Sequence, residues 1–169
     1  GNITNGADLY DFEGYKIYRA TDFEFNDAYN ITDGDGNPTF LEPYVQNGIR
    51  AQWDLVDGKS GWHPVDLNGI KFYLGDDTGL THSYVDHNVV NGQRYYYAVV
   101  SYDYGGDLSN NIIPSDSPMK LRVNPLTGAV SLGPNVVEVV PSPPSAGFVD
   151  ASFAGDQVDH VLGASSGEV

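Results

Sequence analysis

Three side chains with oxygen atoms that can bind metal alternate along the chain at Asp33, Asp35 and Asn37. Alternating carboxylate and amide oxygens open the loop of an EF-hand calcium site. An EF-hand would continue with a glycine and end on a glutamate, but Pro38 and Tyr44 occupy those two positions. The segment is therefore either a calcium site of another kind or a turn whose side chains bond their own backbone. No cofactor is expected, and calcium is the one alternative left open.

Trp53 and Trp62 are the two tryptophans of the chain. Rings of this size can stack on the faces of sugar rings, which would make this region a carbohydrate-binding surface. They also bury large apolar areas, so they could instead anchor a long loop on the core. The sequence supports both interpretations.

Catalytic chemistry has little support in the residue pattern. The chain has no cysteine, which removes thiolate catalysis and disulfides together. Carboxylate pairs are abundant, but a chain with 23 Asp and Glu residues produces them by chance, so they do not indicate a glycosidase. The four histidines fit no zinc spacing and are expected at the surface or half-buried. We expect a protein that is not an enzyme.

Acidic residues dominate the charge, with 23 Asp and Glu against 8 Lys and Arg and a formal net charge of −15. Such a surface repels phosphate groups, which excludes nucleic acid as a partner and disfavours anionic membranes. No run approaches the roughly 18 apolar residues that a membrane helix needs, so no membrane insertion is expected. The expected partner is a protein, either another copy of this chain or a neighbouring domain of a larger protein.

The elements that must position these residues are strands. The segment 12–20 alternates as a strand does, and an Asn-Gly turn signal at 91–92 opens an aromatic and β-branched run at 95–104. Successive strand residues point to opposite faces, so Tyr95, Tyr97 and Val99 form one row of this run and the even-numbered residues form the other. Both rows are apolar, which predicts a central strand of a packed sheet.

Weaker signals fill the rest of the chain. One helical turn is expected within 21–28 and a turn at 33–38. Further strands are expected at 39–45, 49–55, 69–74, 80–86 and 119–123, and 135–140 is a β-branched run. A proline-rich spacer at 141–145 then leads into an extended tail that reaches residue 169.

Three short runs resemble the fibronectin type III family: Gly-Tyr-Lys-Ile-Tyr-Arg at 14–19, Tyr-Val-Asp at 84–86, and Asn-Gly-x-x-Tyr-Tyr-Tyr-x-Val-x-Ser-Tyr-Asp at 91–103. The likeness is to the divergent copies in large bacterial secreted or surface proteins, and it covers roughly residues 11–123. It implies an all-β, immunoglobulin-like sandwich at 1–125, with a long insertion at about 21–80 between strands C and E. Residues 126–169 would hold a strand, the spacer and the tail.

The resemblance also assigns places to structural residues. Tyr15 and Ile17 would lie on strand C, Tyr84 on strand E, and Tyr97 and Val99 on strand F. Leu121 and Val123 would lie on strand G. Tyr95 would be the corner tyrosine, whose hydroxyl bonds back to the preceding loop.

The family places two strands, A and B, before strand C, and only about eleven residues precede it here. Either residues 1–11 supply a degenerate strand, or the two strands come from another chain or a cleaved part. The segment 135–140 or 158–162 could then complete the sandwich of a neighbouring molecule by strand addition. Alternatively, the tail packs locally or starts a next domain.

These observations lead to an expected function. We expect a non-catalytic structural or adhesive module of an extracellular or cell-surface protein, such as a self-assembling filament or surface-layer subunit. The alternative is a carbohydrate- or calcium-binding accessory module of a secreted enzyme.

Overall fold

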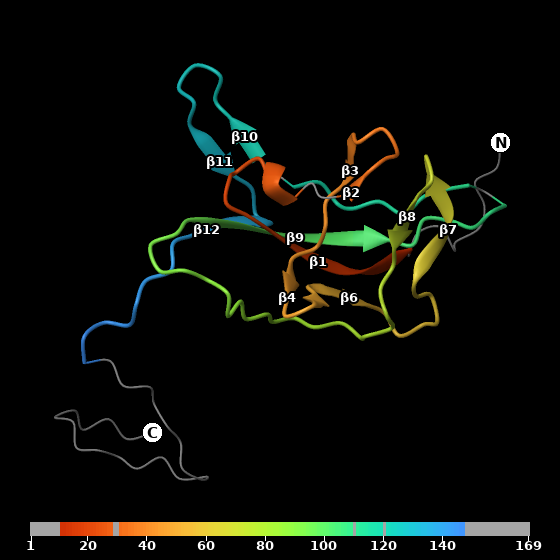
Figure 1. The fold of residues 1–169 in the computed structure, drawn as a ribbon, viewed down its shortest axis with the longest axis horizontal. Helices are drawn as coiled ribbons and strands as arrows, with labels where there is room; N and C mark the ends of the chain where they lie inside the picture. Colours follow the sequence, from red (N-terminus) through yellow and green to blue (C-terminus); the bar gives the residue numbers. More distant parts are fainter. Residues whose placement is uncertain (1–10, 29–30, 110, 120, 148–169) are drawn as a thin grey trace, which may run out of the picture.

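The computed structural model describes residues 11–28, 31–109, 111–119 and 121–147 (Figure 1). Within these residues the regular elements are strands apart from one short 3₁₀ turn, so the protein is all-β as predicted. In chain order they are β1 (Phe12–Ala20), η1 (Asn26–Ala28), β2 (Ile31–Thr32), β3 (Pro38–Phe40), β4 (Val45–Gln46), β5 (Ile49–Arg50), β6 (Gln52–Asp54), β7 (Trp62–Leu67), β8 (Ile70–Tyr73), β9 (Tyr95–Asp103), β10 (Leu121–Val123), β11 (Val130–Leu132) and β12 (Val136–Val139).

A four-stranded antiparallel sheet with the order β12-β9-β1-β6 forms the centre of the molecule (Figure 1). Its two long strands pair along their length, from Phe12 opposite Asp103 to Ala20 opposite Tyr96. The pairing is irregular at Phe12–Gly14. Glycine is required there, because a Cβ at Gly14 would lie 2.2 Å from the carbonyl oxygen of Trp53. The strands predicted at 12–20 and 95–104 are confirmed to within one residue.

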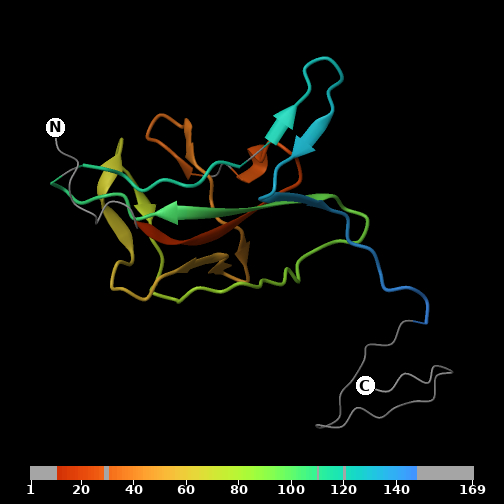
Figure 2. The same ribbon diagram turned by 180° about the vertical axis from the view of Figure 1, so that it is seen from behind.

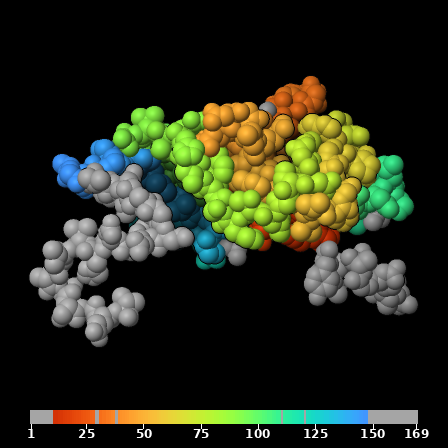
Figure 3. All heavy atoms as spheres, turned by 90° about the horizontal axis from the view of Figure 1, so that it is seen from below, coloured from red at the N-terminus to blue at the C-terminus, as the bar shows by residue number. Residues whose placement is uncertain are grey.

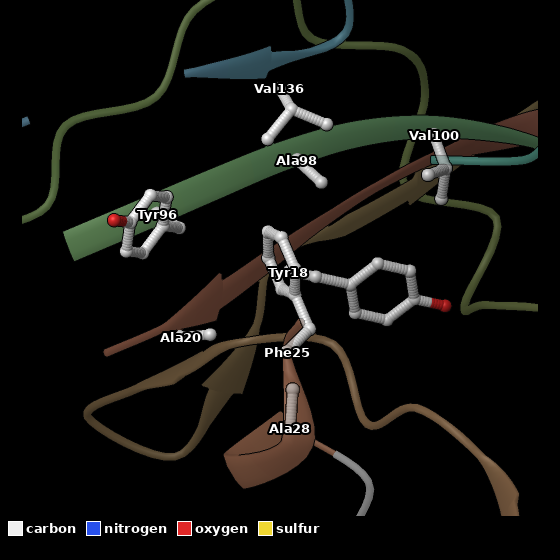
Figure 4. Packing of buried hydrophobic residues seen from close by; sticks show 8 residues of the cluster. All are labelled: Tyr18, Ala20, Phe25, Ala28, Tyr96, Ala98, Val100 and Val136. Atoms are coloured by element: carbon white, nitrogen blue, oxygen red, sulfur yellow. The ribbon is translucent and has the colours of Figure 1, made fainter. Parts of the chain in front are cut away.

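One face of this sheet carries the hydrophobic core, and we call it the core face. Side chains from β1, β9 and β12 meet there with side chains from η1 and the turn before it (Figure 4): Tyr18, Ala20, Phe25, Ala28, Tyr96, Ala98, Val100 and Val136. A second cluster of Phe72, Leu74 and Tyr102 continues the core toward β8. The even-numbered row of β9 is therefore the fully covered one.

Two-stranded hairpins surround the sheet: β2–β3, β4–β5, β7–β8 and β10–β11. η1 and the hairpins β2–β3 and β10–β11 stand on the core face, whereas β4 and the segment 78–90 lie toward the opposite face (Figures 1 and 2). The predicted helical turn exists as η1, and the Asp22 carboxylate caps the preceding turn by accepting the Glu24 amide at 2.9 Å.

The strand predicted at 80–86 does not form, so Tyr84 lies on no strand. The backbone of this segment has no ladder partner, and side chains hold it instead. The Gln46 amide group donates to the Val85 carbonyl at 3.1 Å and accepts the His87 amide at 2.7 Å. The segment thus crosses the sheet as an extended strap, which local alternation could not distinguish from a strand.

The strand beside β9 also differs from the one that the resemblance implied. Residues 121–123 form β10, but β10 pairs with β11 across a local turn and not with β9. The place beside β9 belongs to β12, with Val136 opposite Ala98 and Val139 opposite Tyr95. The run at 135–140 therefore forms the edge strand of its own chain's sheet. Local packing was the alternative to the donation of this run to a neighbouring molecule.

Candidate binding surfaces

The second face of the central sheet, which we call the open face, carries the odd-numbered rows of β1 and β9 with Trp53 of β6. A strap formed by residues 78–90 crosses part of this face, and Figure 3 looks onto it. The strap leaves β12 uncovered at one side, where the blue surface of that strand borders the green of the strap (Figure 3). The open face therefore divides into a part under the strap and a part beside it.

Asp86 fastens the strap to the sheet. Its Oδ2 accepts hydrogen bonds from Arg19 Nη1 at 2.8 Å and from the Tyr97 hydroxyl at 2.7 Å. Its Oδ1 accepts the Tyr44 hydroxyl at 3.2 Å and the Asn88 amide at 2.8 Å. Burial raises the pKa of Asp86, but the hydrogen bonds from Tyr97, Asn88 and Arg19 outweigh this and hold it below its usual value.

Two hollows flank Trp53 under the strap. The first has a volume of about 410 Å³ and runs along the outer edge of β6, between the β4–β5 hairpin and the segment from Tyr73 to Asp76. The second, of about 370 Å³, lies between the strap and the sheet residues Tyr15, Ile17 and Val99. Trp53 lines both, and the Tyr84 ring packs against it at a centroid distance of 5.5 Å.

Valines beside the strap make the rest of the open face apolar. Val99 on β9, which also lines the second hollow, is 49% exposed, and Val137 and Val139 on β12 are 51% and 38% exposed. Val137 and Val139 lie on the edge of the sheet, since β12 is the last strand in the sheet order. We call these three residues the valine patch.

The outer edge of β12 also presents backbone groups. The Val99 amide donates to the Asn135 carbonyl at 3.0 Å, and Val137 and Val139 lie opposite Tyr97 and Tyr95. Alternate residues of an antiparallel strand bond the same neighbour, so the odd-numbered residues of β12 face β9. Glu138, between them, turns its N–H and C=O toward the outer edge, which is the arrangement that accepts a further strand.

The chain matches no protein-family model, no curated protein and no solved structure. The geometry of these surfaces is therefore what a functional proposal can rest on.

The residues proposed for calcium form a turn between β2 and β3. The Asp33 carboxylate accepts the amides of Asp35 at 3.0 Å and Asn37 at 2.8 Å, and the Asn37 side chain donates to it at 3.1 Å. The backbone hydrogen bond from Asn37 is the main cause of the lowered pKa of Asp33. The turn explains the spacing of these residues without a metal, and the calcium assignment stays a prediction.

The two tryptophans lie on neighbouring parts of the surface. Trp53 lines the two hollows, whereas Trp62 is 59% exposed at the start of β7. Trp62 points outward because His63, the next residue of the strand, is fully buried. Tyr73 connects the regions, since it lines the first hollow and packs against Trp62 at 5.0 Å. Anchoring on the core therefore does not account for Trp62.

The residues proposed as structural lie on the open face. The Tyr95 hydroxyl accepts the Val90 amide at 3.0 Å across the turn that contains Gly92, so it does bond back to the preceding loop. Tyr97 bonds Asp86, and Tyr15 and Ile17 line the second hollow.

Sequence reasoning missed several buried polar residues. Lys16, Glu13, Asp54 and His63 are all buried, and no sequence pattern marked them. His63 Nε2 lies 2.6 Å from the Gly106 carbonyl oxygen, which corrects the expectation of surface or half-buried histidines. Asp54 accepts the amides of Asp77 and Thr78, each at 2.7 Å, and so shapes the loop that follows β8.

Other site types have limited support in the described part of the chain. There, no group of three or more His, Asp or Glu residues is arranged to hold a metal ion. No helix among the same residues is long and apolar enough to span a membrane. Residues 163–167 read Gly-Ala-Ser-Ser-Gly, a match to the nucleophile-elbow pattern, but they and the segment 158–162 lie outside the described residues.

Proposed function

We propose that the chain is a non-catalytic structural or adhesive module of an extracellular or cell-surface protein, and that it associates with another copy of itself through its open face. The valine patch carries this proposal. A face of a sheet that is apolar and partly uncovered indicates an interaction surface, particularly when it borders an unpaired sheet edge.

The finer fold assignment belongs to the same proposal. In a fibronectin type III domain, strands C, F and G form one antiparallel sheet, and further strands can extend it beyond C. The observed order β12-β9-β1-β6 fits G, F, C and C′ in that scheme, once strand G is reassigned to β12. The Tyr95 bond to Val90 fits the corner tyrosine. The open face would then be the inner face of an immunoglobulin-like sandwich whose second sheet the described residues do not supply.

A second copy is the occupant to which the proposal commits. Arg94 and Glu138 form an ion pair at 3.2 Å beside the same edge, so the edge carries both signs of charge. A two-fold interface uses the same patch on both subunits, so a patch that carries both signs allows opposite charges to pair across the axis. The net charge of −15 opposes association at long range, and added salt should therefore strengthen it.

Sedimentation velocity over a wide range of protein concentration tests this proposal. We expect the wild type to associate, and to associate more strongly in salt that screens its charge. Val137→Lys should be a monomer under all these conditions. Val123→Lys is the matched control, because Val123 lies on β10 with an exposure of 47% against 51% for Val137, and it should associate like the wild type. A wild type that stays monomeric throughout would contradict the proposal.

A further inference from the structure

We infer that the first hollow beside Trp53, together with Tyr73 and Trp62, binds a neutral oligosaccharide. This site is separate from the valine patch, so it does not depend on self-association. The inference rests on the aromatic lining of the hollow, on the exposed ring of Trp62 beside it, and on the charges at its rim.

The aromatic lining supplies flat apolar walls. Trp53, Tyr73 and Tyr84 all line the hollow, whose volume of about 410 Å³ is in the range of small-molecule sites. The apolar C–H face of a pyranose ring packs favourably on such walls. The rings are also fixed in place, because Trp53 packs on Tyr84 at 5.5 Å and the Arg50 guanidinium lies 5.1 Å from the Tyr73 ring centroid.

Two buried polar atoms of the lining have no hydrogen-bond partner among the described residues. Gln52 is 7% exposed, and its Nε2 donates to the carbonyls of Tyr73 and Leu74, but its Oε1 is unpaired. The Tyr84 hydroxyl is also buried and unpaired. Both atoms are inaccessible to solvent, so a ligand in the hollow would reach them only after the side chains around them move. The exposed side chains of Arg50 and Asp76 on the rim are the donor and the acceptor that a bound sugar can reach directly.

The charges at the rim select a neutral ligand. Among the described residues that line the hollow, Arg50 is positive and Asp76 is negative, and Asp76 accepts the Tyr73 hydroxyl. Asp54 and Asp77 lie just behind this wall, where the Asp77 amide bonds Asp54. A uronic acid or sulfated sugar would therefore meet uncompensated negative charge.

Trp62 extends the site beyond a single sugar. Its ring contacts Tyr73 edge-on with the centroids 5.0 Å apart, and Tyr73 lines both the first hollow and a small pocket of about 40 Å³ that Trp62 also lines. A chain with one ring beside Trp53 would continue over Tyr73 and reach the exposed indole of Trp62. An oligosaccharide should therefore bind more tightly than a monosaccharide.

Titration with defined sugars tests the inference, with isothermal calorimetry and tryptophan fluorescence as readouts. The probes are cellohexaose, xylohexaose, mannohexaose and laminarihexaose, with hexagalacturonate as the anionic comparison. We expect at least one neutral hexaose to bind with a dissociation constant between about 10 µM and 1 mM, and hexagalacturonate not to bind. The failure of all four neutral sugars at about 5 mM, or binding of hexagalacturonate alone, would overturn the inference.

Variants locate the site. Trp53→Ala should weaken binding by about tenfold or more, and Trp62→Ala by less for a disaccharide than for a hexaose. Trp62 is exposed, so its variant keeps the test valid even if Trp53→Ala fails to fold. Leu126→Ala, at an exposed turn, is the control and should bind like the wild type. Val137→Lys should keep sugar binding, which separates this inference from self-association. Binding that survives both tryptophan substitutions would overturn it.

Discussion

Lys16 and Asp116 form an ion pair at 3.1 Å that joins β1 to the loop before β10, and Lys16 is almost fully buried. The Lys16 ammonium also lies 3.6 Å from the centroid of Phe72 and 4.5 Å from that of Tyr102. Burial lowers the pKa of Lys16 to about 8, although Asp116 opposes the shift, so the side chain is still charged at neutral pH. The buried Lys16 charge on the core face is therefore stabilised by one carboxylate, that of Asp116, and by the faces of the Phe72 and Tyr102 rings.

Asp116→Ala should destabilise the fold strongly, because it leaves the buried Lys16 charge without its carboxylate. We expect a loss of about 2–3 kcal/mol, less than for a fully buried pair because the Asp116 side chain is 24% exposed. Lys16→Met should cost less, because methionine is apolar and Asp116 keeps its hydrogen bond from Tyr18. Urea denaturation measures both. Equal losses for the two variants would show that the lone charge is not the cause.

The Asp86 contacts predict a strap that can be released. Asp86→Ala removes the acceptor of Arg19, Tyr97 and Tyr44 and should destabilise the protein by about 3 kcal/mol. It should also speed chymotrypsin cleavage after Tyr84. Asp86→Asn keeps the shape of the side chain but not its charge, so its effect should be intermediate. Cleavage at the wild-type rate in Asp86→Ala would mean that other contacts hold the strap.

Acid should release the strap in the same way. The pKa of Asp86 is lower in the folded protein than the usual 3.8, so its carboxylate stabilises the fold above that value. The stabilisation is lost as the pH falls through the folded-state pKa. Chymotrypsin is inactive there, so hydrogen exchange of the strap amides is the appropriate measurement. Exchange is compared as protection relative to an unfolded peptide at the same pH. The strap of Asp86→Ala should have little protection at any pH, and an acid-dependent loss of protection that persists in this variant would exclude Asp86 as its source.

Glu13 predicts the opposite pH dependence. It is fully buried, neither carboxylate oxygen has a partner among the described residues, and burial together with the Asp57 charge raises its pKa from 4.5 to about 7. The folded state therefore binds a proton that the unfolded state has released between these values, so stability falls as the pH rises. The shift corresponds to at most about 3 kcal/mol, since one pKa unit is about 1.4 kcal/mol.

The Glu13→Gln variant isolates this contribution, because all other carboxylates titrate in both proteins. Wild type and variant should have similar stability near pH 4.5, and the variant should become the more stable protein above pH 7. Thermal unfolding from pH 4 to 8 measures the difference. A difference that does not change with pH would show that folding does not raise the pKa of Glu13.

The strands with strong local patterns could be predicted from the sequence. The features that depend on contacts between distant residues, such as the covered face of the sheet and the buried ion pair, could not. Alternation in β1 and β9 is local, and so is the turn that lets Tyr95 reach Val90. Which face of β9 is covered by the core depends on contacts with residues far away in the sequence. Both rows of β9 were expected to be covered, yet the long excursion after β1 packs on the even-numbered row and leaves Val99 49% exposed. Lys16 is tolerated in that core because Asp116, 100 residues further along the chain, comes to meet it. No residue near Lys16 in the sequence signals this.

The candidate site shows the same limit. Trp53 and Trp62 were marked by type alone, and the structure adds Tyr73 as the ring that connects them. Tyr84 was assigned to a strand, yet it lies on the strap and contributes its ring, which packs against Trp53 in the lining of the hollow. The partner of an aromatic residue in an irregular excursion depends on loop geometry, for which a periodic pattern offers no signal.

The Tyr84 hydroxyl is buried without a partner among the described residues, and its removal therefore predicts a change in stability. Tyr84→Phe removes a buried polar atom that has no partner among the described residues and keeps the ring on Trp53, so stability should be unchanged or rise by up to about 1 kcal/mol. This hydroxyl is inaccessible to solvent, so the same variant should bind the neutral hexaose like the wild type. Tyr44→Phe is the control: it removes a hydroxyl bonded to Asp86, so it should lower stability without weakening the sugar. A Tyr84→Phe protein that is clearly less stable would mean that the hydroxyl has a partner in the folded chain.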